Sequence, residues 1–360
     1  MKDKLAVGIV GCGYWGPNLA RNFSLHPDAE VAALCDIDPD RLEHVRRLHP
    51  GTRAFTDFKR FLESPSLDVV VIATPVKTHH GLAKAALLAG KHVFIEKPMA
   101  SSAAECEDLI AIARSEGLTL MVGHTYLYSE PVRKIADIVR SGGIGELKYI
   151  NCQRLNLGLF QQDINVAWDL APHDLSIILH LMGEAPERVN CQGNAHIHPG
   201  IEDVTNLSLG FKRKRFATIQ SSWLEPRKVR QMTFVGTHKM IVYDDLQPLE
   251  KIRIYDVRVE CPPHYDSFAE FHYSYHYGDC YLPRIEQSEP LKTMCAHLIE
   301  CIREQRRPLT CGQRGLEVVR ILEASSASLR AGGGPVAVAT QPASRRPFRE
   351  ASDQAQPTPP

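Results

Sequence analysis

Short apolar runs alternate with amphipathic stretches in the first part of the chain. The apolar runs have the length of buried strands and fall at residues 5–10, 31–35, 67–73, 92–95 and 118–122. Helical patterns follow or separate them at residues 17–24, 79–89 and 102–115. This alternation predicts an α/β fold with a doubly wound parallel sheet.

The pattern changes after about Gly123. One more helix is expected at residues 131–140, and alternating strands at residues 146–153, 203–209 and 216–222. Half-covered strands of this kind are typical of an antiparallel sheet. We therefore expect an N-terminal domain over residues 1–123 and a second, α+β domain over residues 124–333.

Two late segments lack a clear period. Between Asp256 and about Pro290 the periodicity fades and aromatic residues crowd together, which favours an interface or a packed long loop. A last helix is expected at residues 315–329. The remainder, residues 334–360, is rich in Pro, Ser, Arg and Gln and is expected to be a disordered tail.

Composition excludes several classes of function. Lys plus Arg and Asp plus Glu balance at 42 each, so no overall field favours nucleic acid or an anionic membrane. The 10 cysteines form no C-x-x-C pair and no zinc-type spacing, so no metal site is expected. With no leader-like or membrane-spanning apolar stretch, a soluble cytoplasmic protein is expected.

A glycine turn follows the first predicted strand and precedes a helix: Gly11-Cys12-Gly13-Tyr14-Trp15-Gly16. Such a turn lets the backbone approach a pyrophosphate at the helix N-terminus. Asp36 ends the next strand, where its carboxylate would bind the ribose hydroxyls and repel a 2′-phosphate. NAD is therefore favoured over NADP, although the nearby Arg41 could accommodate the 2′-phosphate of NADP. FAD is a further alternative.

A charged triplet, Glu96-Lys97-Pro98, follows the strand at residues 92–95. Ligands of open α/β sheets bind beyond the carboxyl ends of the strands, so this triplet faces the ligand. Oxidising a secondary alcohol requires a base and a cationic donor for the oxygen, and Lys97 and His173 offer both. The sequence does not say which of them is the base.

His173 follows a proline that suits the first turn of a helix. If Pro172 began a helix running to about Met182, the helix dipole would keep the ring of His173 neutral. Asp169, one turn earlier, would orient that ring but work against the effect of the dipole on its charge, and the sequence does not say which of the two effects wins. Singly, Asp169 is equally consistent with a helix N-cap and His173 with a core histidine.

The ordered set of Thr74-Pro75, the Glu96 triplet and Trp168-Asp169-Leu170-Ala171-Pro172-His173 resembles the Gfo/Idh/MocA oxidoreductase family. The resemblance covers about residues 5 to 330. It implies an N-terminal Rossmann domain, a C-terminal domain with a large, mostly antiparallel open sheet used in oligomerisation, and hydride exchange with a sugar-like alcohol. A homodimer or homotetramer through that sheet is expected.

The resemblance also implies roles for single residues. Lys97 matches the lysine that touches the nicotinamide ribose and the reacting oxygen. The resemblance also implies a cis Lys97-Pro98 bond. Asp169 and His173 match the catalytic D-x-x-x-H pair, although Ala171 stands where the family often has glycine. Cofactor contacts are implied, beyond the glycine turn and Asp36, for Thr74, Pro75, His79, Glu96, Lys97 and Trp168.

Within the family, the segments at residues 123–128 and 168–177 are most similar to the branch acting at C3 of nucleotide-linked sugars. Residues expected to line the sugar pocket, beside Lys97, Asp169 and His173, are Tyr128, Arg154, Asn156 and Trp168. Three alternatives stay open: an inositol or polyol dehydrogenase, an NAD-dependent glycoside hydrolase and a non-catalytic NAD-sensing regulator.

Overall fold

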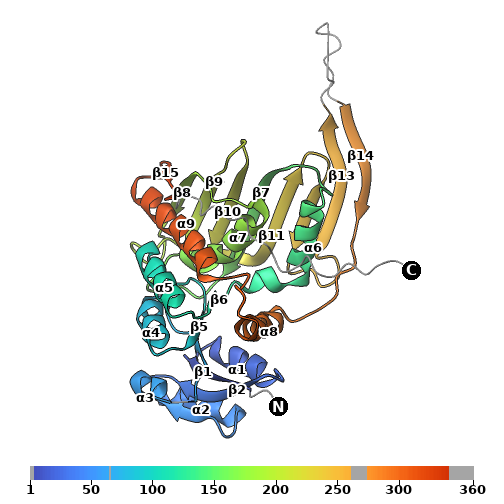
Figure 1. Cartoon of the computed structure of the whole chain (residues 1–360). Coiled ribbons are helices and arrows are strands. Elements are labelled where there is room, and N and C mark those ends of the chain that lie inside the picture. Colours follow the sequence, from blue (N-terminus) through green and yellow to red (C-terminus); the bar gives the residue numbers. More distant parts are fainter. Residues whose placement is uncertain (1–3, 65, 261–273, 340–360) are drawn as a thin grey trace, which may run out of the picture.

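Two sheets organise the chain, one in each half. The computed structural model describes residues 4–64, 66–260 and 274–339. In Figure 1 the six-stranded sheet lies below the nine-stranded one, and α7 and α9 lie against one face of the larger sheet. The expected α/β fold, with a parallel sheet followed by a large and mostly antiparallel one, is confirmed.

The first sheet is parallel throughout, in the order β3-β2-β1-β4-β5-β6. Its strands are β1 (Leu5–Val10), β2 (Ala29–Cys35), β3 (Arg53–Phe55), β4 (Val69–Ile72), β5 (His92–Ile95) and β6 (Leu120–Val122). Its helices are α1 (Gly16–Ser24), α2 (Pro39–Leu48), α3 (Phe58–Leu62), α4 (Val76–Leu88) and α5 (Ala103–Ser115). The apolar runs of β1, β4 and β5 are buried because helices cover both faces.

The second sheet has the order β14-β13-β12-β11-β7-β10-β9-β8-β15, and only β7 and β10 pair in parallel. Its first strands are β7 (Leu147–Leu157), β8 (Arg188–Asn194), β9 (Val204–Gly210) and β10 (Phe216–Ser222). The others are β11 (Leu224–Gly236), β12 (Met240–Asp244), β13 (Ile252–Glu260), β14 (Ser274–Tyr281) and β15 (Val336–Ala337). Cys152, Ile219 and Met232 stand opposite one another on the face that packs under the helices.

The remaining elements connect the sheets. They are the 3-10 turn η1 (Thr125–Tyr128) and the helices α6 (Glu130–Arg140), α7 (Val166–Met182), α8 (Pro290–Arg303) and α9 (Gly312–Arg330). The last two helices return to the first half of the chain. Between them, the carbonyl of Thr310 accepts a hydrogen bond from the amide of Val122 in β6 (2.8 Å), and Arg320 of α9 pairs with Glu107 of α5 (2.6 Å). No helix in the described ranges is long and apolar enough to cross a membrane.

Three expectations were wrong. Periodicity was expected to fade after Asp256, but β13 and β14 pair there as antiparallel strands and extend beyond the rest of the sheet (Figure 1). Much of the aromatic cluster, residues 261–273, lies outside the described residues. The tail was expected from residue 334, yet β15 pairs with β8 and buries Val338; only residues 340–360 of that segment are not described.

The third error concerns α7. This helix begins at Val166, so Pro172 lies inside it and not in its first turn. Asn165 is the N-cap and accepts a hydrogen bond from the amide of Trp168 (3.1 Å), while Gly183 ends the helix in the left-handed region (φ 69°). His173 therefore sits in mid-helix, away from the positive end of the dipole.

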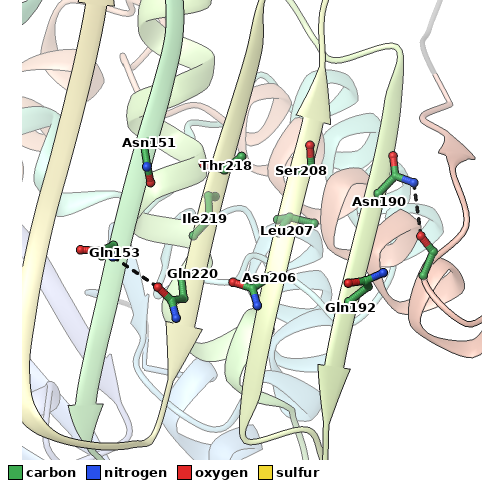
Figure 2. Close-up of a pocket in the computed structure, with 11 residues that line it drawn as sticks. Asn151, Gln153, Asn190, Gln192, Asn206, Leu207, Ser208, Thr218, Ile219 and Gln220 are labelled. Atoms are coloured by element: carbon green, nitrogen blue, oxygen red, sulfur yellow. Dashed lines mark hydrogen bonds between the residues drawn. The ribbon is translucent and has the colours of Figure 1, made fainter. Parts of the chain in front are cut away.

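The face of the larger sheet opposite the helices carries uncharged polar side chains in register. Figure 2 shows one row that crosses four strands, formed by Gln153, Gln220, Asn206 and Gln192. Together with neighbours such as Asn190, these side chains line an open groove of about 440 Å³. The groove lies on the far side of the sheet from α7.

Candidate active site

The glycine turn has room for a dinucleotide. Gly11 has φ +96°, and a Cβ there would lie 2.5 Å from the carbonyl oxygen of Ala73, whereas a Cβ on Gly13 would meet nothing nearer than 3.9 Å. A Cβ on Gly16 would lie 2.0 Å from the carbonyl oxygen of Gly11. Because α1 has no side-chain cap in the described structure, its first amides are available to an anion. These features fit a pyrophosphate.

Asp36 stands at the end of β2 beside the glycine turn. Its carboxylate accepts hydrogen bonds from the amides of Cys12 (2.6 Å) and Asp38 (2.9 Å), which fixes both oxygens close to the turn. Arg41, the residue that would favour a 2′-phosphate, is paired with Asp38 (3.2 Å). This arrangement fits NAD, whose ribose hydroxyls can donate to a carboxylate.

Thr74 and Pro75 follow β4, next to the glycine turn. The side chain of Thr74 would lie 3.0 Å from a Cβ on Gly11, so this loop forms one wall of the turn. His79 is buried, with its ring nitrogens 2.8 Å from the carbonyl oxygens of Pro98 and Thr74. Its ring thus connects the Thr74 loop to the Lys97-Pro98 loop, and the Lys97-Pro98 peptide bond is cis as expected.

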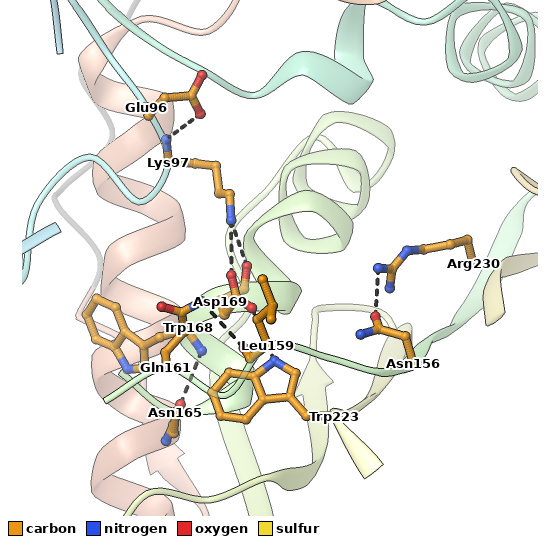
Figure 3. A network of polar contacts seen from close by, with 10 residues as sticks. All are labelled: Glu96, Lys97, Asn156, Leu159, Gln161, Asn165, Trp168, Asp169, Trp223 and Arg230. Carbon is orange, nitrogen blue, oxygen red and sulfur yellow. Dashed lines mark hydrogen bonds and ion pairs between the residues drawn. The ribbon is translucent and has the colours of Figure 1, made fainter. Parts of the chain in front are cut away.

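A network of polar contacts joins the two halves of the chain (Figure 3). The ammonium of Lys97 donates to the main-chain carbonyl of Asp169 (2.9 Å) and lies 3.4 Å from its carboxylate. The other oxygen of that carboxylate accepts from the indole N–H of Trp223 (3.1 Å). Asp169 therefore orients Lys97, and we find no hydrogen bond from it to His173 within the described residues.

His173 projects from α7 into the same region. Its ring lies edge-on to that of Tyr126, with ring centroids 5.1 Å apart, and its buried Nδ1 has no hydrogen-bond partner within the described residues. Burial, followed by the charges of Lys97 and Arg154, lowers the pKa of His173 well below its usual value. Burial therefore favours the neutral ring, and the helix dipole has no part in this because His173 lies in mid-helix.

Glu96 lies beneath this network and is almost fully buried. Its carboxyl group accepts a hydrogen bond from the amide of Lys97 (3.3 Å), and a Cβ on Gly123 would lie 3.0 Å from its carboxyl atoms. Burial raises the pKa of Glu96 to about 7, against the opposing effect of the nearby charge of Lys97.

Two of the expected sugar-binding residues have other roles in the structure. Arg154 forms a buried, two-pronged ion pair with Asp174 (2.7 and 2.8 Å), which occupies the fork expected to bind substrate. Tyr128 is buried in the core, and its hydroxyl contacts that of Thr310 (3.2 Å). Both side chains are satisfied by protein partners because they face the interior.

The other two expected residues stay near the network. Asn156 lies at the end of β7 and accepts a hydrogen bond from Arg230 (2.7 Å). Trp168 is half-buried between the two hydrophobic cores and donates its indole N–H to Ser326 of α9 (2.8 Å). Trp168 is thus held at the junction of the two sheets.

Four neighbours of the site were missed from the sequence: His124, Tyr126, Trp223 and Arg230. His124 is fully buried, its two ring nitrogens have no hydrogen-bond partner in the described part of the chain, and burial lowers its pKa to about 4. His124 and Tyr126 had a sequence signal, since both lie in the segment at residues 123–128 that follows the strand at residues 118–122. Trp223 lies between β10 and β11 and Arg230 lies in β11, and both reach the site only because of the order of the strands in the sheet.

Comparisons with known proteins agree with this geometry. A model described as an oxidoreductase family with an NAD-binding Rossmann fold matches residues 5–124, and the model of the GFO/IDH/MocA C-terminal domain matches residues 132–242. The chain belongs to the Gfo/Idh/MocA oxidoreductase family, as the resemblance implied. It is an NAD-binding oxidoreductase.

Two curated relatives illustrate the range of similar sequences. The uncharacterized oxidoreductase YrbE of Bacillus subtilis is 28% identical over 358 residues, which cover 94% of this chain and 98% of that protein. The 2,7-anhydro-N-acetylneuraminate hydratase of Escherichia coli is 29% identical over 229 residues, which cover 59% of this chain and 61% of that protein.

Solved structures share the fold over nearly the whole chain. The UDP-N-acetylglucosamine 3-dehydrogenase GnnA from Acidithiobacillus ferrooxidans superposes with a TM-score of 0.75 at 23% identity, covering 91% of this chain and 98% of its own. The WlbA dehydrogenase from Bordetella pertussis, in complex with NADH and UDP-GlcNAcA, has a TM-score of 0.77 at 19% identity, covering 94% and 100%. At these identities the likeness shows the fold alone.

Proposed function

We propose that this enzyme exchanges hydride between NAD and a secondary alcohol carbon, C3, of a nucleotide-linked sugar. The observation that carries the proposal is the contact of Lys97 with Asp169 beside a neutral His173 at the carboxyl end of β5. Hydride exchange is the chemistry that NAD supplies when bound. The residues of the chain then have to hold the substrate oxygen and move its proton.

The proton steps can be divided between two residues. Lys97, held by Asp169, donates to the substrate oxygen and stabilises negative charge that develops on it. His173 is neutral and has a free ring nitrogen, so it accepts the hydroxyl proton during oxidation and returns it during reduction. Asp169 acts as a positioning residue through its contacts with Lys97 and Trp223.

For the cofactor, the glycine turn and the N-terminus of α1 would hold the pyrophosphate, and Asp36 the adenosine ribose. Thr74, Pro75 and Glu96 lie along the carboxyl ends of β4 and β5 and would follow the dinucleotide towards the nicotinamide. Exposed Tyr14 and half-exposed Trp15 stand beside the turn, where they would cover the pyrophosphate. His79 and Trp168 would support these contacts from behind.

Preference for a nucleotide-linked sugar is supported by the solved relatives, of which one is a UDP-N-acetylglucosamine 3-dehydrogenase and another is bound to UDP-GlcNAcA. We also propose that copies of the chain associate through the uncovered face of the larger sheet. Its rows of amide side chains can hydrogen-bond to an identical face around a two-fold axis. Light scattering after size-exclusion chromatography would detect this association.

Substitution of the two proton-handling residues tests the chemistry. Lys97→Ala and His173→Ala should each lower kcat by about 10²- to 10⁴-fold, the usual contribution of a positioned acid or base. NADH binding, followed by fluorescence titration, should remain largely intact. The exposed residues Lys59 and His44 provide matched controls, and Lys59→Ala and His44→Ala should change neither quantity. Loss of NADH binding in either site variant would contradict the assignment.

Product analysis tests the substrate. Incubation with NAD and UDP-linked hexosamines or uronates should yield 3-keto sugars and NADH. Turnover of inositol isomers alone would identify a polyol dehydrogenase. Release of free sugar from an aryl glycoside without net NADH would identify a glycoside hydrolase. No turnover with intact NAD binding would favour the regulator.

A further inference from the structure

We propose that Arg230 binds an anionic group of the substrate, most directly a carboxylate on the sugar ring. The inference rests on the proposed function, because it names the substrate class of the same site. Arg230 lies near the start of β11, outside the set of residues to which the sequence assigned a role.

The register of the sheet places Arg230 on the face that carries the site. It stands opposite Arg154 in the antiparallel pair of β11 with β7, and Asn156 follows two residues later on the same face of β7. Arg154 reaches Asp174 on α7, so this face points towards the helix that carries His173. Figure 3 shows the hydrogen-bonded pair of Arg230 and Asn156 to the right of the contact between Lys97 and Asp169.

The two arginines differ in their partners. Arg154 has the buried carboxylate of Asp174, whereas Arg230 donates a hydrogen bond to the neutral amide oxygen of Asn156. Within residues 4–64, 66–260 and 274–339, the buried Nη1 of Arg230 has no hydrogen-bond partner, and we find no ion pair to this guanidinium. Arg230 is therefore a half-buried cation with an unused donor.

An unused donor of this kind is costly. Burial and the charge of Arg154 lower the pKa of Arg230, which means that its charged form is disfavoured where it lies. An anion would remove this penalty, and the planar fork of a guanidinium suits the two oxygens of a carboxylate. Asn156, by holding Nη2, fixes the orientation in which Nη1 is presented.

Arg230 also shares a face of the sheet with Arg154, which reaches the helix that carries His173. Its charge contributes to lowering the pKa of His173, and the carboxylate of Asp169 acts on Arg230 in turn. A sugar whose hydroxyl contacts Lys97 and His173 would thus present a neighbouring substituent to Arg230. Both a ring carboxylate and the pyrophosphate of a nucleotide sugar supply the required anionic oxygens.

Calorimetric titration of the NADH-loaded enzyme tests the proposal without relying on turnover. The probes are UDP-N-acetylglucosaminuronate and UDP-N-acetylglucosamine, which differ in the carboxylate, together with free D-glucuronate and D-glucose. Arg230→Gln should weaken binding of the carboxylate-bearing probes at least about 30-fold and that of the matching probes without the carboxylate under about 3-fold. Arg230→Lys, which keeps the charge but loses the fork, should fall between. Arg227→Gln, an exposed arginine of the same strand, is the control.

The outcomes separate the proposals. Equal weakening of both UDP-sugars, with the free sugars unaffected, would assign Arg230 to the pyrophosphate and still support an anion site. Unchanged affinity of Arg230→Gln for every probe would overturn the inference. If the carboxylate-bearing probes bind through Arg230 but are never oxidised, the anion site stands and the proposed C3 oxidation fails.

Discussion

Substitution of Glu96 by glutamine should stabilise the ligand-free protein at neutral and alkaline pH. The carboxyl group is almost fully buried under Lys97 and Gly123, and glutamine has nearly the same shape without the ability to ionise. Burial raises the pKa of Glu96 from 4.5 to about 7, so the folded state favours the protonated form. Ionising it in the folded protein therefore costs free energy that the unfolded chain does not pay.

The pKa difference fixes the size and sign of this effect. Between pH 4.5 and pH 7 the unfolded chain loses the Glu96 proton first, so the free energy of unfolding falls as pH rises. Linkage with these pKa values gives a loss of about 1 kcal/mol at pH 5 and about 3 kcal/mol at pH 8. The stability advantage of Glu96→Gln over the natural protein should therefore grow by about 2 kcal/mol between pH 5 and pH 8.

Urea denaturation at pH 5, 6, 7 and 8, in the absence of NAD, measures the effect. The exposed Glu116 on the surface after α5 gives a matched control, and Glu116→Gln should run parallel to the natural protein at every pH. If Glu96→Gln also ran parallel, or gained stability towards acid pH, the reasoning from burial would be refuted.

Two further perturbations follow from the structure. Gly13→Ala should weaken NADH binding at least about 10-fold with little change in Tm, because the added Cβ has room in the protein but enters the space of the pyrophosphate. Gly16→Ala should instead lower Tm, because the added Cβ meets the carbonyl oxygen of Gly11. Fluorescence titration and thermal melts would distinguish them, and equal behaviour would contradict the assignment. Arg154→Met should lower the free energy of unfolding by about 3–5 kcal/mol, since it leaves Asp174 buried and unpaired; a loss under about 1 kcal/mol in urea would show that Asp174 is not held as an ion there.

Much of the fold could be predicted because its signals are local. The apolar runs of β1, β4 and β5 and the glycine turn before α1 are contiguous in sequence, and each element was expected close to its observed bounds. Helix starts were less predictable. Pro172 satisfies the rule for a first turn, but the apolar residues before it pack against Trp223 and extend α7 back to Val166.

The site was predictable where a motif surrounds the residue. Lys97, Asp169 and His173 stand in ordered motifs, and the structure brings Lys97 and Asp169 into contact. Arg154 and Tyr128 were expected to line the sugar pocket because their types suit a sugar, but whether a side chain is already satisfied depends on its neighbours. Asp174 and Thr310 supply those partners from distant parts of the chain.

By itself, the sequence determined the parallel sheet, the dinucleotide turn with Asp36 and the charged residues that follow β5, because short-range patterns specify strands, turns and helix ends. Only the tertiary structure decided which charges remain available. Arg154 and Arg230 stand opposite each other on neighbouring strands, yet α7 brings a carboxylate to the first and not to the second. The cost of burying a charge depends on which groups the rest of the fold places within hydrogen-bonding distance of it. Those groups come from elements that are distant in sequence, so only the packed structure determines them.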